Sequence, residues 1–363
     1  MGGVVSRRNL FRVAAAGAAG LVTGALARRG GMLAGRVDAG LPHPDHSGPV
    51  AATGVVAEAR PQALPAPPMG HGQDVGSVGE VELRRAGVDP TRYLTQFDWG
   101  KASKLPNGRT LREYRLVAQG REIEVAPGVM FASWAYNGQV PGPTLRAREG
   151  DRLRIHFTNA HGHAHNIHFH GFHASEMDGI EGIEPGKSFV YEFDAEPFGL
   201  QLYHCHTQPL KRHIHKGLYG TFIIDPPQGR PPARELVMMM NAFDTNFDNE
   251  NEVYAVNSVP FYYARHPIRI KQDELVRIYL VNITEFDPIN SLHLHANFFD
   301  VYRTGTRLTT SEFTDTLMLC QGERAILEFR YKRPGQFMFH AHQSEFVELG
   351  WMSFFEVVAN GAV

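Results

Sequence analysis

From about residue 111 to the C-terminus, hydrophobic and polar positions follow the short runs that are typical of β-strands. Examples are RIHFTN, SFVYEFD and GTFIID, which are rich in β-branched and aromatic residues. No long segment has the spacing of an amphipathic helix. The pattern therefore predicts an all-β fold for this part of the chain.

The strand pattern occurs twice along the sequence. The segment PTLRAREGDRLRIHFTN, from Pro143, resembles HPIRIKQDELVRIYLVN, from His266. Farther along, GKSFVYEF resembles GERAILEF. Each copy has the size of one β-sandwich, and PPQGRPP at residues 226–232 joins them. We therefore expect two related domains, over residues 81–228 and 233–360.

The chain before these repeats has a different composition. Residues 1–27 contain a twin arginine, an Ala/Gly-rich apolar run and a small-x-small cleavage pattern. These features predict a twin-arginine export signal and a periplasmic or extracellular protein. An uncleaved anchor is the alternative, although the apolar run is short for a bilayer span. Residues 28–80 are rich in Pro, Gly and Ala and predict a flexible segment, and residues 81–110 are expected to pack on the first domain.

The net charge and the numbers of histidines and cysteines limit the classes of function that the chain can have. The 363-residue chain has a net charge of only -2, so electrostatics gives no argument for binding nucleic acid or an anionic membrane. Histidine is abundant, with 19 residues, whereas there are only 2 cysteines. A structural disulfide is therefore not expected. We expect Cys320 to be a small buried hydrophobic residue.

The histidines carry the strongest signal, because eight of them form four His-x-His pairs. In a strand, residues i and i+2 point to the same face, so each pair presents two imidazoles together. Eight imidazoles that converge suit a cluster of several metal ions. The pairs are His168/His170, His204/His206, His293/His295 and His340/His342.

One pair has a cysteine at its centre, Cys205, which faces the side opposite to its neighbours. His165 precedes His168 by an odd number of residues, so it also faces that opposite side. His213 follows Cys205 across a loop and can supply a third ligand. One thiolate and two imidazoles form the ligand set of a blue-copper electron-transfer site.

These motifs resemble the multicopper oxidases, specifically their two-domain, laccase-like members. The resemblance implies two cupredoxin-like Greek-key β-sandwich domains and a type 1 copper held by His165, Cys205 and His213. It also implies that the eight paired histidines hold a trinuclear cluster. That gives four coppers per chain: one type 1, one type 2 and a type 3 pair.

The same resemblance implies a reaction. A phenolic, aromatic or metal-ion donor would be oxidised one electron at a time at the type 1 copper, and dioxygen would be reduced to water at the cluster. It further implies a homotrimer with the clusters at subunit interfaces.

The sequence departs from the family pattern at informative positions. Leu218 stands where the family carries an axial methionine, which implies a type 1 copper without an axial ligand and with a higher potential. In the second repeat, Asn290, Ala341 and Phe346 replace the counterparts of the three type 1 ligands, so no second type 1 site is expected there.

Acidic residues, methionines and further histidines outside the ligand pattern also need an interpretation. Glu345 and Asp178 match positions where laccase-like oxidases carry acids near the cluster, and we expect them to relay protons. The consecutive methionines at 238–240 are expected to be packing residues. The histidines outside the ligand pattern, including His161, His163, His173 and His215, are expected to be structural or surface groups. Of these, His173 and His215 are the candidates for a place next to a metal ligand.

Two alternatives remain open from the residues. A copper-containing nitrite reductase also has two cupredoxin domains, but it carries an aspartate at the place of His168 and a single catalytic copper. A copper-binding protein without turnover would not need a thiolate site beside a multi-histidine cluster.

Overall fold

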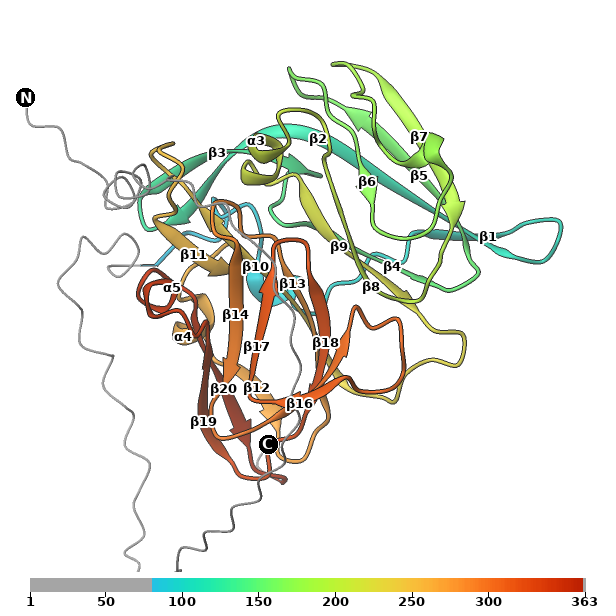
Figure 1. Cartoon of the computed structure of the whole chain (residues 1–363). Coiled ribbons are helices and arrows are strands. Elements are labelled where there is room, and N and C mark those ends of the chain that lie inside the picture. Colours follow the sequence, from blue (N-terminus) through green and yellow to red (C-terminus); the bar gives the residue numbers. More distant parts are fainter. Residues whose placement is uncertain (1–79, 362–363) are drawn as a thin grey trace, which may run out of the picture. The chain divides into compact units, whose positions relative to one another are not determined.

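The computed structural model describes residues 80–361 of the chain. The predicted export signal and nearly all of the predicted flexible segment lie outside the described residues. Within the described residues, no helix has both the length and the apolar character that a membrane span requires. Figure 1 shows strands in curled sheets with a few short helices, which confirms the all-β prediction.

The first sandwich consists of two sheets around an aromatic core. One sheet contains, in order, β1 (Lys101–Lys104), β2 (Thr110–Ala126), β5 (Arg152–Asn159) and β7 (Ser188–Asp194), with β3 (Val129–Tyr136) paired to β2. The other contains β4 (Gly142–Arg148), β9 (Tyr219–Asp225), β8 (Gly199–His204) and β6 (His168–Phe169). Tyr136, Phe157, Phe169 and Phe222 are almost fully buried between these sheets.

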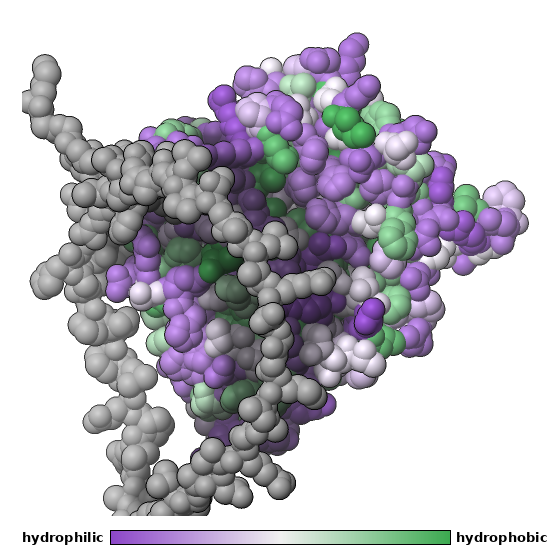
Figure 2. All heavy atoms as spheres, viewed as in Figure 1, coloured by the Kyte–Doolittle hydropathy of each residue, from purple (hydrophilic) through white to green (hydrophobic). Residues whose placement is uncertain are grey.

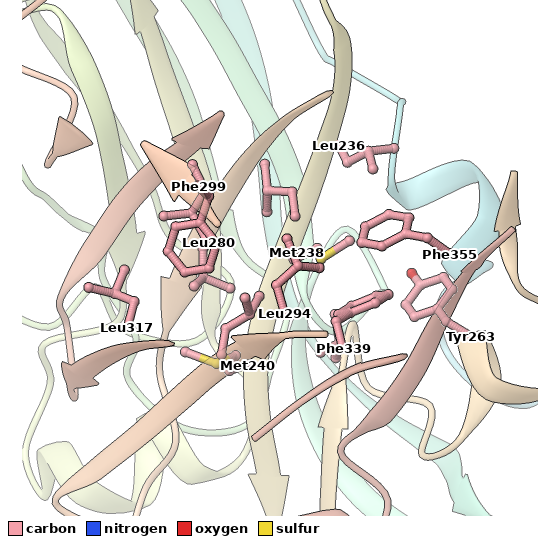
Figure 3. Close-up of a cluster of buried hydrophobic side chains, with 14 of the residues drawn as sticks. Leu236, Met238, Met240, Tyr263, Leu280, Leu294, Phe299, Leu317, Phe339 and Phe355 are labelled. Atoms are coloured by element: carbon pink, nitrogen blue, oxygen red, sulfur yellow. The ribbon is translucent and has the colours of Figure 1, made fainter. Parts of the chain in front are cut away.

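The second sandwich also has two sheets. One contains β11 (Val253–Val256), β10 (Arg234–Phe243), β13 (Val276–Asn282), β18 (Arg324–Phe329), β15 (Phe299–Arg303) and β16 (Glu312–Thr314). The other contains β12 (Ile268–Lys271), β20 (Met352–Val358), β19 (Gly335–His340), β14 (Ile289–Leu294) and β17 (Thr316–Cys320). Figure 3 shows part of its core, where Leu280, Leu294, Phe339 and Phe355 lie together.

The two sandwiches repeat one topology. In the first, β5 runs parallel to β2 and antiparallel to β7. In the second, β13 runs parallel to β10 and antiparallel to β18. The other sheets match as well, because β9 is parallel to β4 and β20 is parallel to β12. The sequence repeat therefore corresponds to a structural repeat.

The helices are short, as the absence of amphipathic patterns indicated. Within residues 80–361 they are α2 (Pro90–Tyr93), the 3-10 turn η1 (Ser175–Met177), α3 (Leu210–His215), α4 (Tyr262–Arg265) and α5 (Ser344–Glu348). Helix α3 follows β8 in the first sandwich, and α5 follows β19 in the second.

The lead-in at residues 81–110 corrects an expectation, because it packs on both sandwiches rather than on the first alone. Leu94 belongs to the core of the second sandwich. The hydroxyl of Tyr263 donates to the carbonyl of Pro90 at 3.0 Å. Local sequence patterns do not encode which distant surface such a segment covers.

A third apolar core, to which both sandwiches contribute, and a set of ion pairs join the two sandwiches. The methionines of β10 alternate as a strand requires: Met238 and Met240 lie in the core of the second sandwich, and Met239 lies in the core shared with the first. This confirms that they are packing residues. Arg146 of β4 donates to Glu235 of β10 at 2.7 Å, with both side chains mostly buried.

The surface contradicts one expectation. Cys320 is exposed rather than buried, because it ends β17 on the outward-facing side of an alternating strand. On the face seen in Figure 2, hydrophilic residues predominate and hydrophobic ones are scattered among them.

Candidate metal centres

Cys205, His165 and His213 come together in the interior of the first sandwich. Cys205 directly follows β8, and His213 lies in α3. The Cys205 Sγ lies 3.1 Å from His213 Nδ1 and 3.8 Å from His165 Nδ1, and the two Nδ1 atoms are 3.1 Å apart. All three side chains are buried. One sulfur and two nitrogens therefore face a single point.

Burial sets the protonation of this group. It lowers the pKa of His165 to about 3 and that of His213 to about 4, with further lowering from neighbouring histidines. Both imidazoles are therefore neutral at physiological pH, as metal ligands must be. Burial raises the pKa of the Cys205 thiol, so binding of a metal ion releases a proton from it.

Leu218 closes this site with apolar atoms. It is fully buried in the same cluster as Cys205. Its carbonyl accepts the Cys205 N–H at 2.9 Å, so its backbone lies beside the ligand. A thiolate and two imidazoles beside the apolar Leu218 fit copper, whereas Mg²⁺ and Ca²⁺ need oxygen ligands.

The first histidine set consists of His168, His170, His204 and His206, and it lies where β6 and β8 pair. His168 is directly opposite His204 in the antiparallel register. Ring nitrogens of His168, His170 and His204 lie within 4.8 Å of one another, and Nε2 of His170 is 3.3 Å from Nε2 of His204. The ring of His206 is 5.4 Å from that of His168, measured between centroids. Imidazole nitrogens this close suit shared metal ions.

Hydrogen bonds orient these rings. The Nδ1 of His168 lies 3.0 Å from the carbonyl of Asp178 and 3.0 Å from its Oδ1. The Nδ1 of His204 lies 3.0 Å from the carbonyl of Cys205. Because carbonyl oxygens only accept, both rings carry their proton on Nδ1, which leaves each Nε2 lone pair for a metal ion.

The second histidine set consists of His293, His295, His340 and His342, and it repeats this arrangement where β14 and β19 pair. His293 is directly opposite His340. Nitrogens of His293, His295 and His340 lie within 4.8 Å of one another, and Nε2 of His295 is 2.9 Å from Nε2 of His340. The ring centroid of His342 is 5.2 Å from that of His293. The Nδ1 of His293 lies 3.0 Å from the carbonyl of Asp315, as the equivalent atom of His168 does with Asp178.

The counterparts of the Cys205 site are filled by packing in the second sandwich. Asn290 is fully buried and donates to the Thr284 hydroxyl at 2.9 Å. Ala341 is buried, and Phe346 stacks on Tyr254 with ring centroids 3.9 Å apart. These side chains offer no thiolate–imidazole set.

The two candidate acids lie in different surroundings. Asp178 contacts His168, and its Oδ1 is also 3.7 Å from Nε2 of His173. Glu345 is exposed near the start of α5. Within residues 80–361, it makes no side-chain hydrogen bond or ion pair with the second histidine set.

Three contacts were not expected from the sequence. Nδ1 of His161 lies 2.8 Å from Nε2 of His165. The Trp134 ring packs on both His165 and His213, with centroids 5.1 and 4.9 Å apart. Arg324, from the second sandwich, lies 3.2 Å from Nδ1 of His170. Trp134 and Arg324 reach these rings from distant segments that only the tertiary fold brings together. His161 and His165 lie four residues apart in one loop, and their contact depends on the conformation of that loop.

Comparison with known proteins agrees with this geometry. Two multicopper oxidase family models match residues 118–229 and 229–360. A solved structure of a multicopper oxidase is 58% identical, with a TM-score of 0.76, covering 77% of this chain and 100% of that one.

Two curated relatives differ in the activity that their names give. The copper-containing nitrite reductase of Neisseria gonorrhoeae is 28% identical over 61% of this chain, and the match spans 62% of its own length. Laccase-2 of Botryotinia fuckeliana is 36% identical over 37% of this chain and 24% of its own length. Because the two family models cover most of its length, the chain belongs to the multicopper oxidase family.

Proposed function

We propose that the protein is a laccase-like oxidase that couples one-electron oxidation of a reducing substrate to reduction of dioxygen to water. His165, Cys205 and His213 hold the type 1 copper. The first histidine set and the second histidine set together hold three further coppers, which makes four per chain. When bound, copper supplies the one-electron chemistry at the Cys205 site and the dioxygen chemistry at the histidines.

The observation that carries the proposal is that the histidines form two half-sites of the same design. Each places two histidines opposite each other on paired strands and orients its rings through Nδ1. Neither half alone supplies the eight ligands that a three-copper cluster has in this family. Each half therefore needs the other, and we propose that the second half comes from a neighbouring chain.

Exposed apolar residues flank both half-sites. Phe172 is 64% exposed and Ile180 is 67% exposed in the loop after the first set. Phe298 and Phe313 stack on each other beside the second set, although 48% and 69% exposed. Large exposed apolar side chains that cluster near a site are typical of protein interfaces. A head-to-tail contact between copies that closes into a ring, a homotrimer, would cover them.

Cys205 connects the two kinds of site. Its Sγ faces His165 and His213, while His204 and His206, its direct neighbours in sequence, belong to the first histidine set. One residue therefore supplies a short covalent link between the outer site and the cluster ligands.

Protons for dioxygen reduction come through acids beside the cluster. Asp178 is placed for this role because its carboxylate contacts His168. Glu345 would act from the second half. We further propose that residues 1–27 direct twin-arginine export to the periplasm or outside the cell, and that the two domains span residues 81–228 and 233–360.

Oxygen uptake distinguishes the proposed oxidase from a copper-containing nitrite reductase, which is the name that several relatives carry. Copper-loaded protein is given 2,6-dimethoxyphenol under oxygen, and separately a reduced electron donor with nitrite under argon. We expect four phenol molecules oxidised per dioxygen and no nitrite consumption. Nitrite consumption without oxygen uptake would overturn the proposal, and neither activity would favour a copper-binding protein.

A further inference from the structure

The side chain of Thr207 carries a buried hydroxyl group without a hydrogen-bond partner. Thr207 lies two residues after Cys205, in the segment that leads from β8 to α3. Among the described residues, no group donates to or accepts from its buried Oγ1. A buried hydroxyl group that makes no hydrogen bond costs stability, so the position of this group calls for an explanation.

A glycine leaves room for this side chain beside the outer site. A Cβ added at Gly182 would lie 3.4 Å from Cγ2 of Thr207, 3.6 Å from its Oγ1 and 3.1 Å from Cβ of Ala164. Ala164 directly precedes His165, and His165 pairs with Ile183, the residue after Gly182, in an isolated bridge. The Thr207 side chain therefore lies against the two backbone segments that hold His165 in place.

The sulfur of Cys205 is within reach of the Thr207 hydroxyl. As a thiol, Cys205 donates to Oδ1 of Asn166 at 3.5 Å. Burial raises the pKa of this thiol, whereas the backbone of Asn166 and both the hydroxyl and the backbone of Thr207 lower it. Groups that lower the pKa of a thiol are those that stabilise its thiolate. The hydroxyl of Thr207 is therefore close enough to interact with the charged form of the sulfur.

The protonation of the sulfur explains why the hydroxyl has no partner in the copper-free chain. A neutral thiol is a weak acceptor, and its own hydrogen is directed at Oδ1 of Asn166, which also accepts the N–H of His206 at 2.7 Å. A metal ion replaces the thiol hydrogen, which leaves a thiolate that only accepts. The thiolate is the acceptor that the Thr207 hydroxyl lacks.

We propose that Thr207 raises the reduction potential of the type 1 copper by donating its hydroxyl hydrogen to the Cys205 thiolate, and thereby determines how weak a reductant the outer site can oxidise. This inference rests on the proposed function. The sulfur carries more negative charge beside copper(I) than beside copper(II), so the hydrogen bond is stronger in the reduced state. A bond that is stronger in the reduced state favours electron uptake.

Thr207 acts as a positioning residue, because it contacts a copper ligand and not the substrate. In the electron transfer, the donor loses one electron and copper(II) becomes copper(I), while the hydroxyl hydrogen stays on Oγ1. No proton moves in this step. The apolar side chain of Leu218 acts in the same direction, because it gives copper(II) no additional ligand.

Two substitutions separate the hydroxyl group of Thr207 from the rest of its side chain. Thr207→Val keeps the shape and removes the hydroxyl, whereas Thr207→Ser keeps the hydroxyl and removes the methyl group. Thr221→Val is the matched control, because Thr221 also has a buried hydroxyl without a partner, but in β9 near Tyr93. Redox titration of the blue absorption gives the potential of each copper-loaded variant, and copper per chain is measured alongside.

We expect Thr207→Val to lower the equilibrium constant for electron uptake about tenfold, which is about 59 mV for one electron, as loss of one hydrogen bond to a charged group implies. Thr207→Ser and Thr221→Val should keep the potential of the wild type, with equal copper content in all variants. An unchanged potential in Thr207→Val would overturn the proposal. Equal shifts in Thr207→Val and Thr207→Ser would also overturn it, because packing would then set the potential.

The copper-free protein provides a second test, in which the hydroxyl has no function to perform. Thr207→Val should unfold in urea at a midpoint equal to or above that of the wild type, since it removes a buried group without a partner. A lower midpoint would mean that the hydroxyl is already hydrogen-bonded without copper, and its role at the thiolate would be wrong.

Oxygen uptake with 2,6-dimethoxyphenol, measured on the same copper-loaded preparations, separates this inference from the proposed function. A lower potential in Thr207→Val without oxygen uptake in any preparation would contradict only the oxidase. Oxygen uptake with the same potential in Thr207→Val and the wild type would contradict only the role of Thr207.

Discussion

His168 and His204 lie directly opposite each other on paired antiparallel strands, and each carries a second histidine two residues farther on. Opposite residues and i+2 residues are the nearest side-chain neighbours that a sheet offers on one face. Strand pairing and the i, i+2 spacing are therefore enough to bring four imidazoles together. The register of His293 with His340 repeats this in the second sandwich.

Cys205→Ser removes the soft ligand of the outer site. We expect loss of the intense blue absorption and of about one copper per chain, because an alcohol is a poor ligand for a blue-copper site. The paramagnetic signal of the type 2 copper should remain. Copper analysis with absorption and paramagnetic resonance spectra measures both, and a retained blue band would exclude Cys205 as the ligand.

Leu218→Met places a thioether next to the same site. An axial sulfur stabilises the oxidised copper, so we expect a lower reduction potential than in the wild type. Leu218→Ile serves as the control, because it keeps an apolar side chain of the same volume. Redox titration of the blue absorption measures the change; an equal potential in the methionine and isoleucine variants would show that position 218 does not face the copper.

Arg146→Met breaks the ion pairs that join the sandwiches. Arg146 bridges Asp225 and Glu235, and all three side chains are mostly buried. We expect the free energy of unfolding to fall by about 3 kcal/mol, because buried carboxylates lose their partner. Arg269→Met is the control: Arg269 is 70% exposed in its pair with Glu356, and such pairs contribute about 1 kcal/mol or less. An equal decrease in the free energy of unfolding of both variants, measured with urea, would contradict this prediction.

The copper-free protein should lose stability in mild acid. Burial lowers the pKa of His165 to about 3 and those of His204 and His213 to about 4. The unfolded chain protonates its histidines near pH 6.5, so below that pH it binds more protons than the folded chain. The free energy of unfolding therefore falls as the pH decreases from about 7.5 to about 5.5.

Bound copper should weaken this dependence, because it competes with protons for the same nitrogens and stabilises the folded state. Urea unfolding midpoints at the two pH values, with and without copper, measure both effects. Midpoints of the copper-free protein that do not change with pH would mean that these histidines are not buried in the neutral form.

Much of this architecture could be predicted from local sequence rules. Strand alternation placed His168 and His204 on one face and Cys205 on the other, and the repeat predicted two sandwiches. Both rules act within a few residues or within one repeat, which is why they succeed. The same alternation applied to β17 would have placed Cys320 outward, but its residue type suggested burial instead.

The rest depends on contacts between segments that lie far apart. Trp134 lies in β3, far along the chain from the loop that holds His165, so its approach to His165 follows only from the closed sandwich. Arg324 reaches His170 from the second sandwich. The lead-in covers both sandwiches for the same reason. Such contacts have no signature in spacing.

The central claim is that each copper cluster forms between the first histidine set of one chain and the second histidine set of another. Co-expression of a His170→Ala chain with a His295→Ala chain tests it directly, because each variant damages only one half. Either variant alone should show no oxygen uptake. Random mixing should restore about one quarter of wild-type activity, as one interface in four then joins two intact halves. If the mixture stays as inactive as the separate variants while native mass spectrometry shows that mixed oligomers form, the cluster lies within a single chain and the account is wrong.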